Sequence, residues 1–470
     1  MVNGLSGNQM LLGLAVGIVL LIFMVLKTKI QAFLALIIST VVVGVIGGMP
    51  LTTIMIKVDG VEKPFGIVNS ITSGFGGTLG SIGIIIGFGV MMGQIFEVTG
   101  AAKRMAYTFL RIFGKGKEEY ALAFTGFMVS IPIFCDSGFL VLAPIAKALS
   151  ETTKKSVIAL GVSLASGLVI THSLVPPTPG PLGVCGIFGV DVGKFILLTL
   201  VLAIPMTIAC IAYAKSLGRK YPWVQQSDGT VKVVEKCEPD YEAAFNMDME
   251  GVPGALESFM PLILPILLIL INTVATALGK TTGFMQVLIF LGQPIVAVGL
   301  GLVVAIFTLG RRLDRTTCLA EIEKGMQGAG IIMLVTGGGG ALGQIIKDSG
   351  LGNYMADGMA KAAIPMILLP LVISTAMRFI QGSGTVAMTT AASISAPILL
   401  AAGTSPLLGC VACCVGSLFF GYFNDSYFWV VNRTLGVAEA KDQLRIWSVN
   451  STIAWAIGVI EVIILSFIMK

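Results

Sequence analysis

One acidic residue stands alone in a long apolar stretch of the chain. Asp136 is followed directly by Ser137 and Gly138. No other charged residue occurs between Val129 and Pro144. A carboxylate at membrane depth is energetically costly and by default marks a functional site. Such a group can take up and release a proton, or it can be a structural acid that pairs with a cation. We predict that this triplet contacts a substrate.

Two further ionisable side chains lie in polar interruptions of apolar segments. His172 is the only histidine, and it could carry a proton or hydrogen-bond a substrate. Asp425 allows the same two interpretations as Asp136. We predict that all three take part in proton coupling. The residues predicted to contact substrate from these two interruptions are Thr171, His172, Ser173, Asn424, Asp425 and Ser426.

A second Ser-Gly pair follows an arginine late in the chain. Arg378 lies seven residues before Thr385. It could extend to a membrane interface, or it could bind a substrate carboxylate. The short segment after it offers hydroxyls and free backbone amides that suit an anion. Its predicted substrate-binding residues are Gly382, Ser383, Gly384 and Thr385.

The composition indicates a membrane protein. Of the 470 residues, 55% are hydrophobic and only 12% are charged, and the mean hydropathy is +0.94. Soluble domains carry roughly 25% charged residues. The apolar segments are too long for barrel strands of about 10 residues. The net charge of +5 is spread over short loops, which excludes a nucleic-acid partner and favours a membrane-lipid environment.

Two apolar segments are too long for a single span of about 20 residues. They lie around 119–149 and 364–402, and glycine or proline interrupts each. Backbone that leaves a helix at membrane depth must line a cavity or be buried in protein. Each segment is therefore predicted to be a re-entrant helical hairpin with Ser-Gly at its tip. The proline-rich run from Thr171 to Pro181 predicts a broken transmembrane helix.

An internal repeat relates the two halves of the chain. Residues 93–100 read GQIFEVTG, and residues 343–350 read GQIIKDSG, at an offset of 250. Two later pairs follow in the same order, Ser137 with Ser383 and His172 with Asp425. Glu97 and Glu461 lie near the ends of apolar segments, where we expect membrane interfaces.

Basic residues in short loops set the predicted topology. Placing all of these loops in the cytoplasm satisfies every span if both over-long segments are re-entrant. The N-terminus is then periplasmic and the two repeats are inverted, as in many secondary transporters. The basic loops are 27–29, 103–117, 154–155, 215–220, 311–315 and 433–445.

The predicted fold is therefore an all-α polytopic membrane protein. It has two inverted repeats, each with a re-entrant hairpin and a broken transmembrane helix. The predicted domains are an N-terminal helical hairpin at 1–66, the first repeat at 67–220, a cytoplasmic loop at 221–257, linking scaffold helices at 258–315 and the second repeat at 316–470. Within the linking region, 285–309 is predicted to be one span.

The motifs at these positions resemble the gluconate permease family of bacterial proton symporters, within the larger ion transporter superfamily. They are IPIFCDSGF at 131–139, THSLVPPTPGP at 171–181, QGSGT at 381–385 and GYFNDS at 421–426. The resemblance implies import of gluconate or a related small hydroxy acid with protons across the bacterial inner membrane. It also implies a homodimer and elevator-type alternating access. Other members of the family carry other sugar acids or D-serine.

The sequence allows three alternatives to this function. Broken helices can also bind sodium, so a sodium-coupled carrier or a D-serine-type permease of the same fold is possible. An intramembrane aspartyl protease could use Asp136 and Asp425, but the internal repeat and paired Ser-Gly tips argue against it. We therefore expect a carrier of small anions with no enzyme activity, cofactor or metal.

Overall fold

The protein is described here by a computed structural model. It describes residues 5–28, 30–58, 61–226, 231–233, 249–279, 282–361, 365–422 and 424–469. Most of the hydrophilic loop predicted at 221–257 lies outside these ranges. Within the described part of the chain, eight helices are long and apolar enough to cross a membrane. The prediction of a multi-pass helical membrane protein is confirmed.

The helices of the described residues run in the following order along the chain. The first half contains α1 (Gly7–Phe23), α2 (Ala32–Ile46), α3 (Ile67–Thr99), α4 (Ala101–Phe113), α5 (Glu118–Val129), α6 (Cys135–Thr153), α7 (Val157–Leu174), α8 (Pro179–Phe188) and α9 (Val192–Lys220). The linking helices are α11 (Ala255–Ala277), α12 (Phe284–Leu291) and α13 (Pro294–Thr308). The second half contains α14 (Arg315–Asp348), α15 (Leu351–Lys361), α16 (Leu368–Gln381), α17 (Gly384–Ala401), α18 (Pro406–Gly416), α19 (Ser426–Thr434), α20 (Ala440–Gln443) and α21 (Val449–Ile468).

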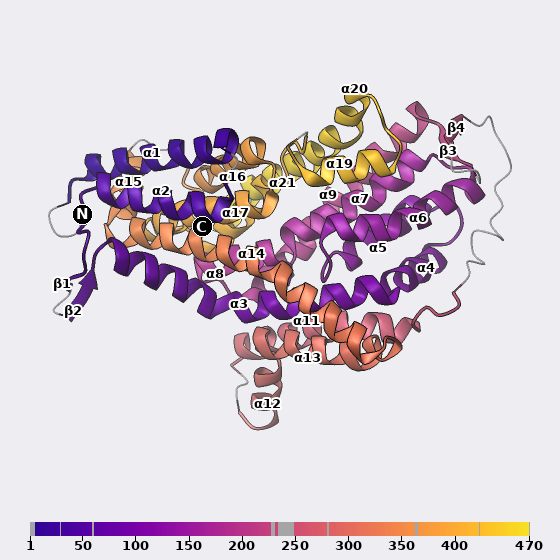
Figure 1. Ribbon diagram of the computed structural model, residues 1–470, viewed down its shortest axis with the longest axis horizontal. Coiled ribbons are helices and arrows are strands. Elements are labelled where there is room, and N and C mark those ends of the chain that lie inside the picture. Colours follow the sequence, from indigo (N-terminus) through magenta and orange to yellow (C-terminus); the bar gives the residue numbers. More distant parts are fainter. Residues whose placement is uncertain are drawn as a thin grey trace.

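The fold is not purely helical. Two short antiparallel hairpins occur between the long helices, β1 (Ile54–Val58) with β2 (Val61–Phe65) and β3 (Trp223–Gln225) with β4 (Val231–Val233). Figure 1 shows β1 and β2 at the same end of the molecule as the N-terminus, and β3 and β4 at the opposite end. These hairpins close connections between helices, where the sequence predicts only loops.

The long helices α3 and α14 pack side by side (Figure 1). A Cβ added to Gly74 would lie 2.4 Å from the carbonyl oxygen of Gly340. A Cβ added to Gly325 would lie 2.7 Å from the Cα of Met91. Later residues of α3 thus meet earlier residues of α14, so the two helices are antiparallel. Small residues let the backbones approach this closely.

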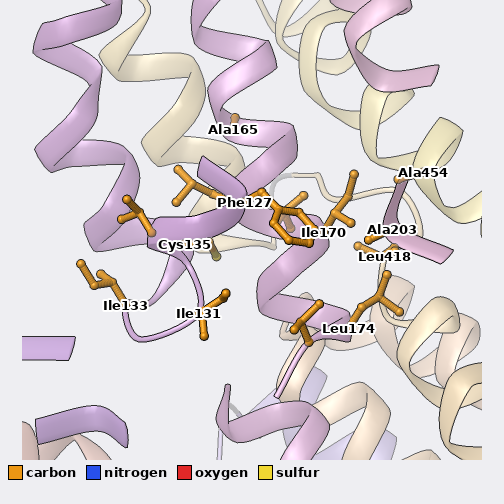
Figure 2. Close-up of a cluster of buried hydrophobic side chains, with 14 of the residues drawn as sticks. Phe127, Ile131, Ile133, Cys135, Ala165, Ile170, Leu174, Ala203, Leu418 and Ala454 are labelled. Carbon is orange, nitrogen blue, oxygen red and sulfur yellow. The ribbon is translucent and has the colours of Figure 1, made fainter. Parts of the chain in front are cut away.

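The first over-long segment forms two helices, α5 and α6, joined by residues 130–134. Figure 2 shows side chains of this turn, including Ile131 and Ile133, in one apolar cluster with Ile170 and Leu174 of α7. At the other end, Lys155 makes ion pairs of 2.7 Å with Glu118 and with Glu119. The start of α5 and the end of α6 therefore lie together, as a hairpin requires.

The second over-long segment also forms two helices, α16 and α17. Gly382 ends α16 with a φ of +80°, a left-handed conformation that favours glycine. A Cβ there would also lie 2.2 Å from the carbonyl oxygen of Asn424. Ser383 then caps α17, because its hydroxyl accepts a hydrogen bond from the Val386 amide at 3.4 Å. The turn is thus set by one glycine and one cap.

The first helix break lies later than the sequence predicts. The helix α7 continues through Thr171 to Leu174, and only residues 175–178 leave it. The residue before a proline disfavours the helical region, which stops α7 just before the Pro176–Pro177 pair. Pro179 occupies the first turn of α8, where its missing N–H has no cost. The prediction that the span stops at Thr171 is therefore wrong, and so is the prediction that Pro179 to Pro181 are not helical.

The predicted span at 285–309 is also interrupted. It forms α12 and α13, which are separated by Gly292 and Gln293. A Cβ at Gly292 would lie 2.2 Å from the carbonyl oxygen of Leu268 in α11, so the chain turns against that helix. In the second repeat, the break between α18 and α19 runs from 417 to 425, as predicted around Asp425.

Candidate substrate site

A cavity of about 310 Å³ lies between the two hairpin tips and the two broken helices. Its lining includes most of the residues that the sequence predicts to bind substrate. These are Asp136, His172, Ser173, Arg378, Gly382, Ser383, Gly384, Thr385, Asn424, Asp425 and Ser426. Residues up to 290 positions apart in the chain thus share one polar cavity.

Asp136 lies in the first turn of α6 and faces the second half of the molecule. The hydroxyl of Ser426, the first residue of α19, donates a hydrogen bond of 3.0 Å to its Oδ1. No lysine or arginine of the described residues forms an ion pair with it. The first hairpin tip therefore contributes a carboxylate whose charge no neighbouring cation neutralises.

Arg378 and Asp425 form a buried ion pair. The Nη2 of Arg378 lies 2.5 Å from Oδ2 of Asp425, and each side chain is 6% exposed. Oδ1 of Asp425 also accepts a hydrogen bond of 3.1 Å from the Tyr427 amide and so caps α19. Arg378 does not extend to an interface, and its charge is matched by Asp425. A Cβ at Gly421 would lie 2.6 Å from Asp425 Oδ2, so glycine leaves room for the pair.

His172 lies in the last turn of α7 at the edge of the cavity. Its ring centroid lies 5.7 Å from that of Phe134 in the first hairpin tip. Its Nδ1 is buried and has no hydrogen-bond partner among the described residues. One ring nitrogen of His172 is therefore available to a substrate group or to water.

Three helices begin at the cavity wall. The first residues of α6, α17 and α19 all line it, so the N-terminal ends of three helices meet at the same space. Unpaired N–H groups and the helix dipole favour negative charge at such ends. The second tip has no ionisable side chain of its own between Gly382 and Thr385. The wall can therefore bind an anion through backbone amides.

Three predicted residues lie outside the cavity lining. The Ser137 hydroxyl lies close to the carboxylate of Glu97 on α3. A Cβ on Gly138 would lie 2.8 Å from Cδ2 of Leu168, so this glycine lets α6 pack closely on α7. Thr171 is fully buried, and its hydroxyl has no partner among the described residues. These three residues do not face the cavity in this structure, because successive residues of a helix point in different directions.

Five lining residues were not predicted. They are Phe134, Cys135, Val169, Ser417 and Tyr427. Val169 lies three residues before His172, so the two residues share one face of α7. The helical period therefore predicts Val169 as a neighbour of the cavity if α7 continues through His172. Tyr427 follows Ser426, and its hydroxyl donates to the carbonyl of Ala165 at 3.1 Å. Ser417 carries no signal in the sequence, since it reaches the cavity only because α18 ends there.

Comparisons with known proteins identify the family. The model of the GntP family permeases matches residues 9–468. The chain belongs to this permease family. It is 46% identical over 97% of its length to a Haemophilus influenzae protein named an uncharacterized permease, covering 92% of that protein. It is 32% identical over 97% of its length to a high-affinity gluconate transporter of Escherichia coli, covering 99% of that protein.

A solved structure supports the fold. The YdaH transporter of Alcanivorax borkumensis matches with a TM-score of 0.58 and 14% identity. The match covers 97% of this chain and 98% of that one. The resemblance to gluconate permeases is thus confirmed at the level of family, and the protein is a transporter rather than an enzyme. The aspartyl protease alternative is wrong, and one of its two acids is already bound to Arg378.

Proposed function

We propose that this permease imports gluconate or a related small hydroxy acid together with protons. The observation that carries the proposal is the charge of the cavity. Arg378 and Asp425 neutralise each other, and Asp136 has no cationic partner among the described residues. An ionised Asp136 would repel a substrate carboxylate at such short range. A proton on Asp136 removes this repulsion, so anion and proton bind together.

The rest of the lining suits a polyhydroxy acid. The amides at the starts of α6, α17 and α19 favour the carboxylate. Side-chain hydroxyls and an amide can bond the substrate hydroxyls, and they belong to Ser173, Thr385, Ser417, Asn424 and Ser426. A relative at 32% identity is named a gluconate transporter. The roles of Asp425 and His172 in proton coupling, and of all these residues in binding, stay predictions.

The same proposal includes inverted repeats and an elevator-type movement of the two hairpins in the bacterial inner membrane, within a homodimer. The antiparallel packing of α3 on α14 supports inversion, because these helices occupy the same place in the two repeats. The ion pairs of Lys155 support re-entrance, because both ends of the first hairpin meet at one end of the molecule. That end carries basic loops, so we place it in the cytoplasm and the N-terminus in the periplasm.

Uptake by proteoliposomes tests the proposal. Labelled gluconate, D-glycerate and D-serine are offered under an imposed pH gradient without sodium, to wild type and to Asp136→Asn. We expect wild type to accumulate one of the hydroxy acids, and the variant to lose accumulation while it keeps downhill exchange. Asp357→Asn, an exposed acid on α15, is the matched control and should accumulate like wild type.

Other outcomes would overturn parts of the proposal. Accumulation that needs a sodium gradient would exclude proton coupling. Accumulation of D-serine alone would exclude the hydroxy-acid substrate. Full accumulation by Asp136→Asn would exclude Asp136 as the proton carrier.

A further inference from the structure

The two hairpins pack against the long helices α3 and α14 at positions that are not equivalent in the repeat. Gly93 on α3 and Gly343 on α14 are equivalent in the repeat. A Cβ on Gly93 would lie 2.0 Å from the carbonyl oxygen of Pro132, just before the first tip. A Cβ on Gly343 would lie 3.0 Å from the carbonyl oxygen of Ser393, well beyond the second tip at Ser383. Ten helical residues separate Ser393 from that tip, which is about 15 Å.

The next turn of the same two helices carries opposite charges. Glu97 follows Gly93 by four residues, and Lys347 follows Gly343 by four. Glu97 lies one helical turn beyond the contact of Gly93 with Pro132, so it lies close to the first hairpin tip. Lys347 instead lines a separate cavity of about 260 Å³ with Pro397, in the last turns of α17. The acid thus lies at a tip, and its cationic counterpart lies about 20 Å from one, at 1.5 Å per residue along α17.

The cavity around Lys347 is polar. Ser73, Thr78 and Ser81 from α3 and Gln344 from α14 contribute to its wall. The adjacent acid, Asp348, accepts hydrogen bonds from Ser70 at 2.6 Å and from Gln344 at 2.8 Å. Lys347 itself forms no ion pair in the described part of the chain. Its charge is therefore available to an anion.

The surroundings of Glu97 differ in sign. The charged groups that act on Glu97 are Glu321 and Lys324 of α14. These two pair with each other at 2.5 Å. Their charges offset one another, so Glu97 accounts for the net negative charge of this group of three residues.

We propose that Lys347 binds the substrate carboxylate when the carrier faces the opposite side. In this structure the first hairpin tip lies next to Gly93 and Glu97 of α3. If the second hairpin moves to the equivalent position on α14, Ser383 comes next to Lys347, and the anion site moves with it. The first tip then leaves Glu97. An anion is attracted at the Lys347 side and repelled at the Glu97 side, which favours capture at one face and release at the other. This inference rests on the transport function proposed above.

The sidedness follows from the fold. Ser70, the partner of Asp348, lies in the first turn of α3, directly after β2. Figure 1 shows β2 at the end of the molecule that holds the N-terminus. That end is the periplasmic one in the proposed topology. Lys347 therefore belongs to the outer face, from which an importer collects its substrate.

Paired cysteines test the change of register. In membranes, Lys347→Cys with Leu400→Cys should cross-link in the arrangement described here, since both residues line one cavity. Lys347→Cys with Ser383→Cys should cross-link only when a substrate and pH gradient drive the cycle. Lys347→Cys alone controls for the native cysteines, and those of the described residues are buried. Mass spectrometry identifies the linked peptides. A Lys347–Ser383 link that never forms, while the Lys347–Leu400 link does, would overturn the proposal.

Sided transport kinetics test the charge. With substrate outside, Lys347→Gln should raise KM about tenfold, the loss expected for one charged hydrogen bond, and Lys347→Arg should restore it. Lys57→Gln, an exposed lysine on β1, controls for surface charge and should leave KM unchanged. A normal external KM for Lys347→Gln would sink this inference while leaving the transport function intact. A wild type that moves no hydroxy acid would instead remove the function on which it rests.

Discussion

The two hairpin tips fill equivalent places in the repeat but differ in chemistry. The first tip places the carboxylate of Asp136 in the opening turn of α6. It accepts hydrogen bonds from Ser426 and from the Cys135 thiol, and no cation of the described residues pairs with it. The second tip has no charge. It consists of a left-handed Gly382 and a capping Ser383, and its arginine lies one turn earlier in a buried pair with Asp425.

This difference indicates a division of labour. A carboxylate without a fixed partner can change its protonation without breaking the structure, so the first tip suits a variable charge. A buried ion pair cannot lose one member cheaply, because the other is left as an uncompensated charge. The second tip and its break therefore keep a fixed structure, while the carboxylate of the first tip can bind and release a proton.

Breaking the fixed pair should have the largest effect. Arg378→Met leaves Asp425 buried without its cation, which should destabilise the protein by about 3–5 kcal/mol. Thermal unfolding in detergent measures this. Asp136→Asn, at the other tip, should unfold close to wild type. Adding Asp425→Asn to Arg378→Met should recover most of the lost stability; a double variant as unstable as the single would show that the pair is not the cause.

Replacing the glycine at each tip by alanine should have the next largest effect on stability. Gly382→Ala forces a left-handed alanine and places its Cβ 2.2 Å from a backbone oxygen, so we expect a loss of about 2 kcal/mol or more. Gly138→Ala meets only the end of the Leu168 side chain and should lose about 1 kcal/mol. Melting temperatures of both variants rank them, and the reverse order would contradict the comparison.

The smallest effect concerns the base of the first hairpin. Burial lowers the pKa of Lys155, but the interactions of its ammonium group with the carboxylates of Glu118 and Glu119 outweigh it, so the pKa is raised. A raised folded-state pKa stabilises the fold below the unfolded value of about 10.4, and this contribution disappears as pH rises through the folded value. Lys155→Met should therefore lose about 1 kcal/mol at pH 7.

That loss should fade in alkaline buffer. Melting curves of wild type and Lys155→Met between pH 7 and 11 would converge, if the ion pairs are responsible. A gap that stays constant across this range would indicate lost packing of the lysine stem rather than lost charge. The second hairpin base has no equivalent ion pair among the described residues, so it offers no such pH dependence.

Local sequence signals located the polar groups well and the helix ends less well. The isolated acid, the second Ser-Gly pair and the two polar breaks all lead to one cavity, because polar groups in apolar segments must be enclosed. The sequence predicts the first break at Thr171, four residues before the C-cap of α7 at Val175, since a proline restricts only its immediate predecessor. Ser417 could not be predicted, because nothing local shows where α18 ends.

The membrane class, the internal repeat and the polar residues follow from the order of residues, because hydropathy, loop charge and spacing are properties of the chain alone. The tertiary structure sets which polar groups meet. It joined Arg378 to Asp425 and left Asp136 without a cation, and it put Glu97 at a tip but Lys347 far from one. Charge pairing and register depend on distances across the fold, and these are set by how helices pack rather than by the order of residues.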